Sequence, residues 1–274
     1  MSRKLSRSTP LILSIGATLC LAACGGGSTH TQRSAAAPNG GAASPTTRSA
    51  PTATPGATTP AAATRGSGGQ GGGLGLQTAR LNVAGQDHDL LFYAPLNLSS
   101  PRPLLFVLHG QGGNAQVTLL NGLNLADQHG FVVAATSASG SAGGWVESTD
   151  APVLGAALGY LEGLYDIDLQ RRYLWGFSAG GHFAHLLGLA NSDLFAAYAT
   201  SAGVLTRNIV PSRLISVSLQ VGDLDPLLAE VEKTRQFLTA RGHPVTMDVF
   251  QGGHTVAASH RERAWQELSR HRSP

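Results

Sequence analysis

A Gly-x-Ser-x-Gly motif is centred on Ser178, with Gly176 and Gly180 on either side. The preceding residues 172–177 are apolar and aromatic, as is typical of a buried strand, and a helix-like spacing follows the motif. A strand that turns sharply into a helix places the middle residue on a strained corner with its side chain exposed. Glycines flank such a corner because a Cβ there would collide with the neighbouring strand and helix. The motif therefore predicts a nucleophilic hydroxyl at Ser178.

A general base and its carboxylate partner are also available. His254 follows the apolar segment 245–250, on a glycine-flanked loop, and Asp223 and Asp225 follow a similar segment over 214–221. A serine nucleophile needs an imidazole as its base, and the imidazole needs a carboxylate that fixes its tautomer. The ends of strands are where α/β sheets bind their ligands, which favours His254 as the base. Either aspartate could serve; we favour Asp225, just before an expected helix, because Asp223 could instead cap the turn.

The loop 109–114, of sequence His-Gly-Gln-Gly-Gly-Asn, directly follows the apolar run 104–108. Acyl transfer needs two backbone N–H groups aimed at the oxygen that becomes negative, and small residues let the backbone approach closely. We expect these donors to be the N–H groups of Gln111 and of Ala179, the residue after the serine. The alternative is a plain glycine-rich turn. We interpret His109, which belongs to this loop, as a structural hydrogen-bonding residue rather than a base.

Two further residues are candidates for a substrate pocket. Trp145 follows the glycine–serine loop 139–144 and could form an aromatic wall or plug the surface of the domain. His182 lies on the helix after Ser178 and could line the site, although packing of that helix is the favoured interpretation for both His182 and His185. We find no spacing typical of metal ligands, so we expect neither a metal nor an organic cofactor.

Strand-like and helix-like segments alternate through residues 74–274, with no evident internal repeat. We expect strands at 79–84, 89–94, 104–108, 131–135, 172–177, 196–201, 214–221 and 245–250. We expect helices at 119–128, at 150–165 with Asp150 as N-cap, and directly after Ser178. We expect two more, one that follows the strand 214–221 and ends at residue 240, and one at 259–270. Continuous apolar runs such as 104–108 are typical of strands buried on both faces. The alternation predicts a mostly parallel α/β sheet flanked by helices, in one domain.

The N-terminal residues 1–23 are typical of an export signal. Three basic residues precede the apolar stretch 11–21, which is too short to span a bilayer. The sequence Leu-Ala-Ala-Cys-Gly that ends at Gly25 resembles the bacterial lipobox, which implies cleavage before Cys24 and lipidation of that cysteine; the alternative is an ordinary secretory signal. We therefore expect a protein exported from a bacterial cell and anchored to a membrane of the cell envelope by its lipid, or released from there.

Residues 25–73 are almost entirely Gly, Ala, Ser, Thr and Pro, without an acidic residue. Such a stretch cannot bury enough apolar surface to offset the entropy lost on ordering. We expect 24–73 to comprise the lipidated Cys24 and a disordered tether, with the folded domain over 74–274. The two cysteines, Cys20 and Cys24, both precede that domain, so we expect no disulfide in it.

The net charge of +3 says little about partners, because it arises at the N-terminus. Six of the 19 basic residues and none of the 16 acidic ones precede residue 74, which leaves 13 basic and 16 acidic residues in the folded part. No basic stripe interleaved with aromatic residues is present. The sequence therefore does not favour nucleic-acid binding.

With these residues in view, the chain resembles α/β-hydrolases of the polyhydroxybutyrate depolymerase and feruloyl esterase type, which are secreted esterases with a serine nucleophile. The matching stretches are PLLFVLHGQGGNA, YDIDLQRRYLWGFSAGGH, DLFAAYATSAG, VGDLDP and GGHT. The order Ser178, Asp225, His254 is also the order of the catalytic triad in that fold. The resemblance implies the α/β-hydrolase fold and hydrolysis of small or oligomeric carboxylic esters, of short-chain, hydroxyalkanoate, feruloyl or acetyl type, through an acyl-enzyme. Because the loops between strands are short, we expect one compact domain without a large lid, and we expect a monomer.

The chain departs from that group in its lack of disulfides, of an appended carbohydrate- or polymer-binding segment and of long loops between strands. These departures favour small or oligomeric esters over polymers. Two alternative functions remain: a surface-anchored binding protein that keeps the fold without catalysis, and a peptidase or amidase. The complete set of Ser178, Asp225 and His254 favours an enzyme over a binding protein, and a domain of this size leaves little room to present a peptide.

Overall fold

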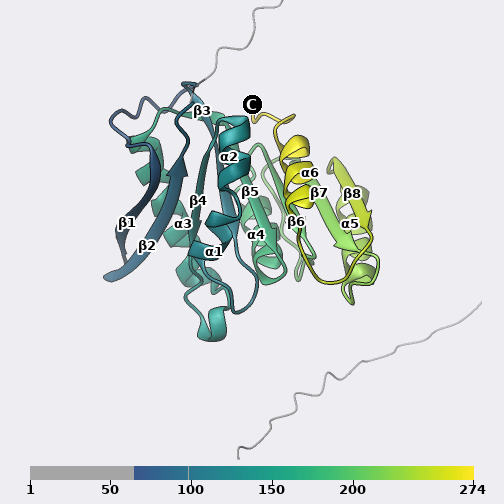
Figure 1. The fold of residues 1–274 in the computed structure, drawn as a ribbon. Helices are drawn as coiled ribbons and strands as arrows, with labels where there is room; N and C mark the ends of the chain where they lie inside the picture. Colours follow the sequence, from purple (N-terminus) through teal and green to yellow (C-terminus); the bar gives the residue numbers. More distant parts are fainter. Residues whose placement is uncertain (1–64, 98) are drawn as a thin grey trace, which may run out of the picture. The chain divides into compact units, whose positions relative to one another are not determined.

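The computed structural model describes residues 65–97 and 99–274. An eight-stranded sheet runs through it in the order β1-β2-β4-β3-β5-β6-β7-β8 (Figure 1). The strands are β1 (Gly75–Val83), β2 (Gln86–Ala94), β3 (Arg102–Leu108), β4 (Val132–Thr136), β5 (Ile167–Phe177), β6 (Ala197–Ser201), β7 (Ser216–Gly222) and β8 (Val245–Phe250). Each strand expected from the sequence is present, although β5 begins five residues earlier than the apolar run suggested. The expected export signal, Cys24 and the tether up to residue 64 lie outside the described residues.

The sheet is antiparallel at one edge and parallel elsewhere. β1 and β2 form a hairpin, and β2 pairs antiparallel with β4. The hairpin turns at Ala84 and Gly85, which both have positive φ (52° and 80°), as the tight turns that match strand twist require. All pairings from β4 through β3 to β8 are parallel. The expectation of a mostly parallel sheet is therefore confirmed.

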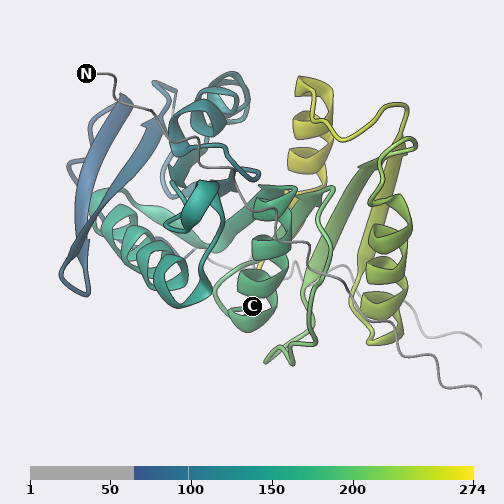
Figure 2. The same ribbon diagram turned by 90° about the horizontal axis from the view of Figure 1, so that it is seen from below.

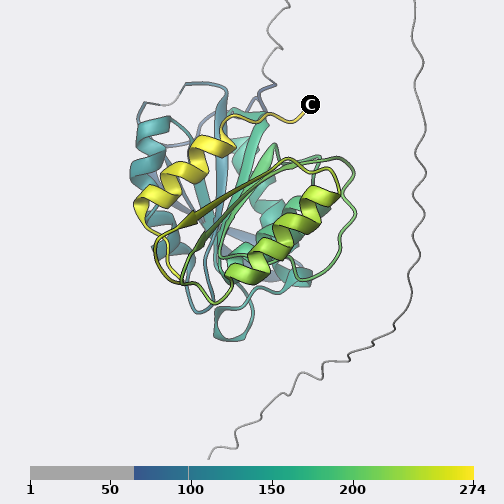
Figure 3. The same cartoon turned by 90° about the vertical axis from the view of Figure 1, so that its right-hand side faces the viewer.

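Helices cover both faces of the sheet (Figures 2 and 3). They are α1 (Ala115–Leu120), α2 (Leu123–His129), α3 (Glu147–Leu164), α4 (Ala179–Ala190), α5 (Leu228–Ala240) and α6 (Ala258–Leu268), with a short 3-10 turn at Ser141–Gly143. One apolar cluster joins one face of the sheet to α3, α4 and α5, and a second joins the other face to α1, α2 and α6. Because the parallel strands contribute to both clusters, they are buried on both sides, which explains their continuous apolar sequences.

Two helix predictions need correction. The helix expected over 119–128 is two helices, α1 and α2, because the chain breaks at Asn121 and Gly122. The helix expected to begin at Asp150 begins at Glu147. Asp150 is not its N-cap: the carboxylate is buried inside the first turn, where it accepts the N–H groups of Val146 at 2.6 Å and Ser139 at 3.0 Å. From inside the first turn, the carboxylate thus accepts the Val146 N–H, an amide at the start of the helix that would otherwise lack a partner.

The tether expected up to residue 73 ends earlier, because residues 65–73 lie against the domain. Gly66 forms a β-bridge with Asp168, and the Ser67 hydroxyl is 2.8 Å from the carbonyl oxygen of Glu162. The Gly72 N–H donates to the Leu164 carbonyl at 3.0 Å. Composition predicted disorder because the stretch buries little apolar surface, but it is held by backbone hydrogen bonds to the end of α3. Within the described ranges, no helix is both long and apolar enough to cross a membrane.

Candidate active site

Ser178 stands at the sharp turn between β5 and α4 that the motif predicted. Its backbone has φ 52° and ψ −116°, which is outside the regions that residues with a Cβ ordinarily occupy. The flanking glycines are required by close backbone contacts. A Cβ at Gly176 would lie 2.1 Å from the carbonyl oxygen of Gly180, and one at Gly180 would lie 2.4 Å from that of Leu108. The turn therefore holds the serine hydroxyl above the carboxyl end of the sheet.

The three residues expected to act together form one hydrogen-bonded chain. The Ser178 hydroxyl donates to Nε2 of His254 at 2.8 Å, and Nδ1 of His254 donates to Oδ2 of Asp225 at 2.9 Å. The side chain of Asp225 is 1 % exposed, and its second oxygen accepts the Leu227 N–H at 2.8 Å. Because the carboxylate accepts only from an Nδ1–H, it fixes the tautomer in which Nε2 can take a proton from the serine.

Asp223, the alternative partner, lies elsewhere. Its exposed carboxylate accepts the Gly252 N–H at 2.9 Å, while the Leu224 N–H donates to the Gly252 carbonyl at 2.9 Å. These bonds join the loop after β7 to the loop after β8. Asp223 thus fixes the two loops that carry Asp225 and His254, and Asp225 is the aspartate that contacts the imidazole.

The loop after β3 is held by side chains rather than by packing alone. His109 is buried; its Nε2 accepts the Ala138 N–H at 3.0 Å, so its Nδ1 carries the proton and donates to the Gly110 carbonyl at 2.8 Å. Nε2 of Gln111 donates to the Ala142 carbonyl at 2.6 Å. His109 therefore has the structural role expected of it.

The two amides expected to bind an oxyanion are free to do so. Within the described part of the chain, the backbone N–H groups of Gln111 and Ala179 donate no hydrogen bond. Ala179 is the first residue of α4, where the helix carries partial positive charge. A free N–H at the start of a helix directly after the serine is suited to stabilising a negative oxygen, and Gln111 lines the cavity that also contains His254.

Trp145 and His182 pack into the domain near the site. The Trp145 ring stacks on Phe183, with centroids 5.0 Å apart, and its Nε1 donates to the His109 carbonyl at 2.9 Å. Nδ1 of His182 accepts the Val204 N–H at 2.7 Å. Burial, together with the nearby His254, lowers the pKa of His182. Neither side chain is among the residues that line the cavity described next, and both pack against the domain.

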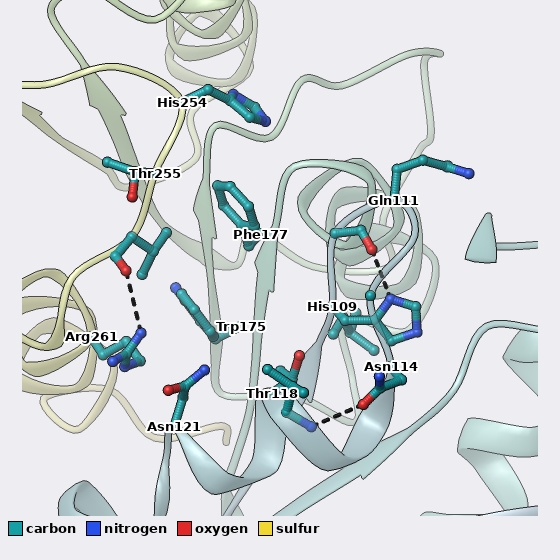
Figure 4. Close-up of a pocket in the computed structure, with 15 residues that line it drawn as sticks. His109, Gln111, Asn114, Thr118, Asn121, Trp175, Phe177, His254, Thr255 and Arg261 are labelled. Carbon is teal, nitrogen blue, oxygen red and sulfur yellow. Dashed lines mark hydrogen bonds between the residues drawn. The ribbon is translucent and has the colours of Figure 1, made fainter. Parts of the chain in front are cut away.

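A cavity of about 340 Å³ has His254 in its wall (Figure 4). His254 and Gln111 lie at one end of it, Trp175 and Phe177 lie in the middle, and Arg261 lies at the far end together with Asn121. Arg261 and Asn121 could not be identified from the sequence, since neither belongs to a motif. Phe177 could have been found, because it adjoins the serine. Within the described residues, no group of three or more His, Cys, Asp or Glu is placed to hold a metal ion.

Comparison with known proteins gives partial sequence matches. No protein-family model matches the chain. It is 34% identical over 123 residues to "Bifunctional acetylxylan esterase/xylanase XynS20E" of Neocallimastix patriciarum, which covers 43% of this chain and 18% of that protein. It is 36% identical over 146 residues to "Putative esterase NocK" of Nocardia uniformis subsp. tsuyamanensis, covering 47% of this chain and 42% of that protein. The matches thus span less than half the length of either relative.

Solved structures match more of the chain at lower identity. A ferulic acid esterase aligns with TM-score 0.59 and 18% identity over 71% of this chain and 97% of its own. Esterase PE8 aligns with TM-score 0.55 and 22% identity over 72% and 99%. The poly(3-hydroxybutyrate) depolymerase LpqC of Bordetella parapertussis aligns with TM-score 0.54 and 18% identity over 72% and 95%. Together with the sheet order and the serine turn after β5, these alignments show that the chain has the α/β-hydrolase fold.

Proposed function

We propose that the protein is a serine esterase that hydrolyses carboxylic esters through an acyl-enzyme. The observation that carries the proposal is the chain of hydrogen bonds from the buried Asp225 through His254 to Ser178, with the serine held on a strained turn. A structural serine has no need of this arrangement, whereas a nucleophile does. The esterases named among the similar proteins support the same class of reaction.

In the first half of the reaction, Oγ of Ser178 attacks the carbonyl carbon of the ester while Nε2 of His254 takes the hydroxyl proton. The buried carboxylate of Asp225 stabilises the imidazolium that results. The tetrahedral intermediate then breaks its C–O bond, and the leaving alcohol receives the proton from Nε2. The acyl group is left as an ester on Ser178.

The second half repeats these steps with water. His254 takes a proton from a water molecule, whose oxygen attacks the acyl carbon, and the bond to Oγ breaks as the serine regains its proton. In both halves the carbonyl oxygen becomes negative. The N–H groups of Gln111 and Ala179 would bind it, and a single donor of this kind is typically worth about 10²–10³ in kcat.

The substrate class is proposed from the cavity and from the similar proteins. A volume of about 340 Å³ is at the small end of ligand pockets, which suits a short or single-ring group rather than a long polymer. The similar proteins include an acetylxylan esterase, a ferulic acid esterase and a hydroxybutyrate depolymerase. We therefore propose esters of short-chain, hydroxyalkanoate, feruloyl or acetyl type as substrates.

The test is hydrolysis of 4-nitrophenyl esters from acetate to octanoate by the full chain and by Ser178→Ala. We expect turnover by the native protein and a loss of at least about 10³-fold in kcat for the variant, with an unchanged melting temperature. Ser269→Ala, on the exposed end of α6, is the matched control and should keep full activity. A folded native protein without activity on any ester would show that the proposal is wrong and would favour a binding protein, whereas an active Ser178→Ala would show that Ser178 is not the nucleophile.

We further propose that Cys24 carries a lipid that anchors the protein to the bacterial envelope. The support is the sequence alone: a basic start, a short apolar stretch and Leu-Ala-Ala directly before Cys24. Expression in a bacterium fed an alkyne fatty acid tests it. The label and membrane association should appear on the native chain and disappear in Cys24→Ser; equal labelling of both would exclude this cysteine as the site.

A further inference from the structure

Arg261 places a positive charge in the wall of the cavity that holds His254. It lies on the first turns of α6, and its guanidinium faces the end of the cavity away from His254 (Figure 4). The side chain is half-buried, and burial lowers its pKa. Among residues 65–97 and 99–274, its guanidinium forms one hydrogen bond, from Nη1 to the Val256 carbonyl, and at 3.5 Å this is longer than an effective bond of this type. The guanidinium therefore has most of its hydrogen-bonding capacity unused.

Most other arginines of the described domain have a carboxylate partner. Eight form ion pairs: Arg80, Arg171, Arg172, Arg207, Arg235, Arg263, Arg270 and Arg272. Within the described residues, Arg261 shares the lack of an ion pair with Arg65, Arg102, Arg213 and Arg241, but none of these four lines the cavity. Arg263, two residues after Arg261, pairs with Asp248 at 2.6 Å. In the described part of the chain, no carboxylate pairs with Arg261. A partly desolvated cation without a counter-charge is unfavourable, so this side chain is suited to an anion that comes from outside the protein.

The rest of the cavity wall supports the same conclusion. No aspartate or glutamate lines it, so no fixed negative charge competes for the guanidinium. Asn121 and Thr118 lie near Arg261 on the wall, and within the described residues their side chains form no hydrogen bond with the protein. Trp175 and Phe177 separate this polar end from His254. The cavity thus has a reacting end, an aromatic middle and a cationic end.

We propose that Arg261 is a specificity-determining residue that binds a carboxylate of the substrate, so that the preferred substrates are esters carrying a free carboxylate group. The planar guanidinium donates two parallel hydrogen bonds to a carboxylate, and Asn121 can add a third from its amide. Oligomers of hydroxy acids have this chemistry, because each ends in a carboxylate. The inference rests on the proposed esterase function, since it assigns the other end of the same substrate.

The experiment compares anionic and neutral substrates of equal length. On the acyl side, the pairs are mono-4-nitrophenyl adipate, suberate and sebacate against 4-nitrophenyl hexanoate, octanoate and decanoate. On the alcohol side, the pair is the linear dimer of 3-hydroxybutyrate against its methyl ester. The three acyl lengths allow for different separations of carboxylate and ester. We expect the native chain to have a higher kcat/KM for the anionic member on at least one side.

Variants of Arg261 then assign that preference. Arg261→Gln should lower kcat/KM for the preferred anionic ester by about tenfold, chiefly through KM, and leave the neutral esters within about twofold. Arg261→Lys should retain part of the preference. Arg263→Gln removes the same charge from the same helix but outside the cavity, so it should change kcat/KM for neither the anionic nor the neutral esters.

The outcomes separate this inference from the proposed function. If neutral esters are hydrolysed in a Ser178-dependent way but no anionic ester is preferred, the carboxylate site is wrong and the esterase stands. The same holds if Arg261→Gln lowers anionic and neutral rates equally. If the native chain hydrolyses no ester of either kind, the proposed function itself has failed.

Discussion

Replacing Asp225 with asparagine tests the chain of hydrogen bonds most directly, because the change removes one charge and almost no volume. Oδ1 of Asp225 accepts the Leu227 N–H at 2.8 Å, and an asparagine oxygen would keep that bond. Its NH₂ group would then face Nδ1 of His254, which lies 2.9 Å from Oδ2 in the native protein. Two donors cannot face each other, so the imidazole would move its proton to Nε2 and could no longer accept one from Ser178.

The expected loss follows from the geometry. With the carboxylate 1 % exposed, an effective dielectric constant of about 20 applies, and opposite charges about 4 Å apart attract by about 4 kcal/mol. This attraction is present in the transition state, when His254 is an imidazolium, and absent when it is neutral. Because about 1.4 kcal/mol corresponds to a tenfold change in rate, the lost charge alone lowers kcat by about 10³. The wrong tautomer adds to this, for a total of about 10³–10⁴.

The assay is kcat for 4-nitrophenyl butyrate, with circular dichroism and a melting curve to show that each variant folds. Asp223→Asn is the matched control: its oxygen can still accept the Gly252 N–H, so kcat should stay within about threefold of native. If Asp225→Asn keeps more than a tenth of the native kcat, or if Asp223→Asn loses as much, the assignment of Asp225 as the orienting carboxylate is refuted.

Other predictions concern stability. Gly176→Ala places its Cβ 2.1 Å from the carbonyl oxygen of Gly180, so it should lower the free energy of unfolding in urea by about 1–3 kcal/mol and displace Ser178. Gly159→Ala, on the open face of α3, should instead raise that free energy by about 0.5–1 kcal/mol and keep full activity. Equal effects would contradict the contact argument. Burial lowers the pKa of His185 to about 3, below its unfolded value of 6.5, so the unfolded chain binds the extra proton and stability falls with acid. Between pH 7 and pH 5, the free energy of unfolding of the His185→Gln variant should therefore fall by about 2 kcal/mol less than that of the native protein. An identical decrease in the two proteins would refute the linkage.

The parts of the site that were predictable from sequence are those fixed by local covalent rules. A serine between two glycines after an apolar run can occupy a strained turn at little cost elsewhere in the chain, so Gly176, Ser178 and Gly180 predict both structure and chemistry. The parallel strands were equally clear, because burial on both faces leaves apolar runs without alternation. His254 and Asp225 could be placed near Ser178 only through the topology, since parallel strands bring their carboxyl ends to one edge.

The remaining features depend on contacts between distant segments. Residues 65–73 have the composition of a disordered chain, and their order comes from bonds to the end of α3, about a hundred residues away. Asp150 is typical of an N-cap, but its partner Ser139 comes from the preceding loop and pulls it inside the helix. Arg261 could not be identified from the sequence, because the lack of a carboxylate partner depends on which residues surround the side chain in the folded protein.

The segment between β8 and α6 joins the two ends of the proposed site. His254 and Val256 lie on it, and Arg261 follows on the first turn of α6, so the imidazole and the guanidinium are connected by a short stretch of chain. That helix is fixed to the sheet by Trp265, whose ring stacks on Phe131 with centroids 3.9 Å apart. Ser178, in contrast, is fixed by β5 and α4. The distance from Ser178 to the proposed carboxylate site is therefore set by how α6 packs on the sheet, and the substrate length preferred in the proposed reaction should depend on that packing as much as on the residues that touch the substrate.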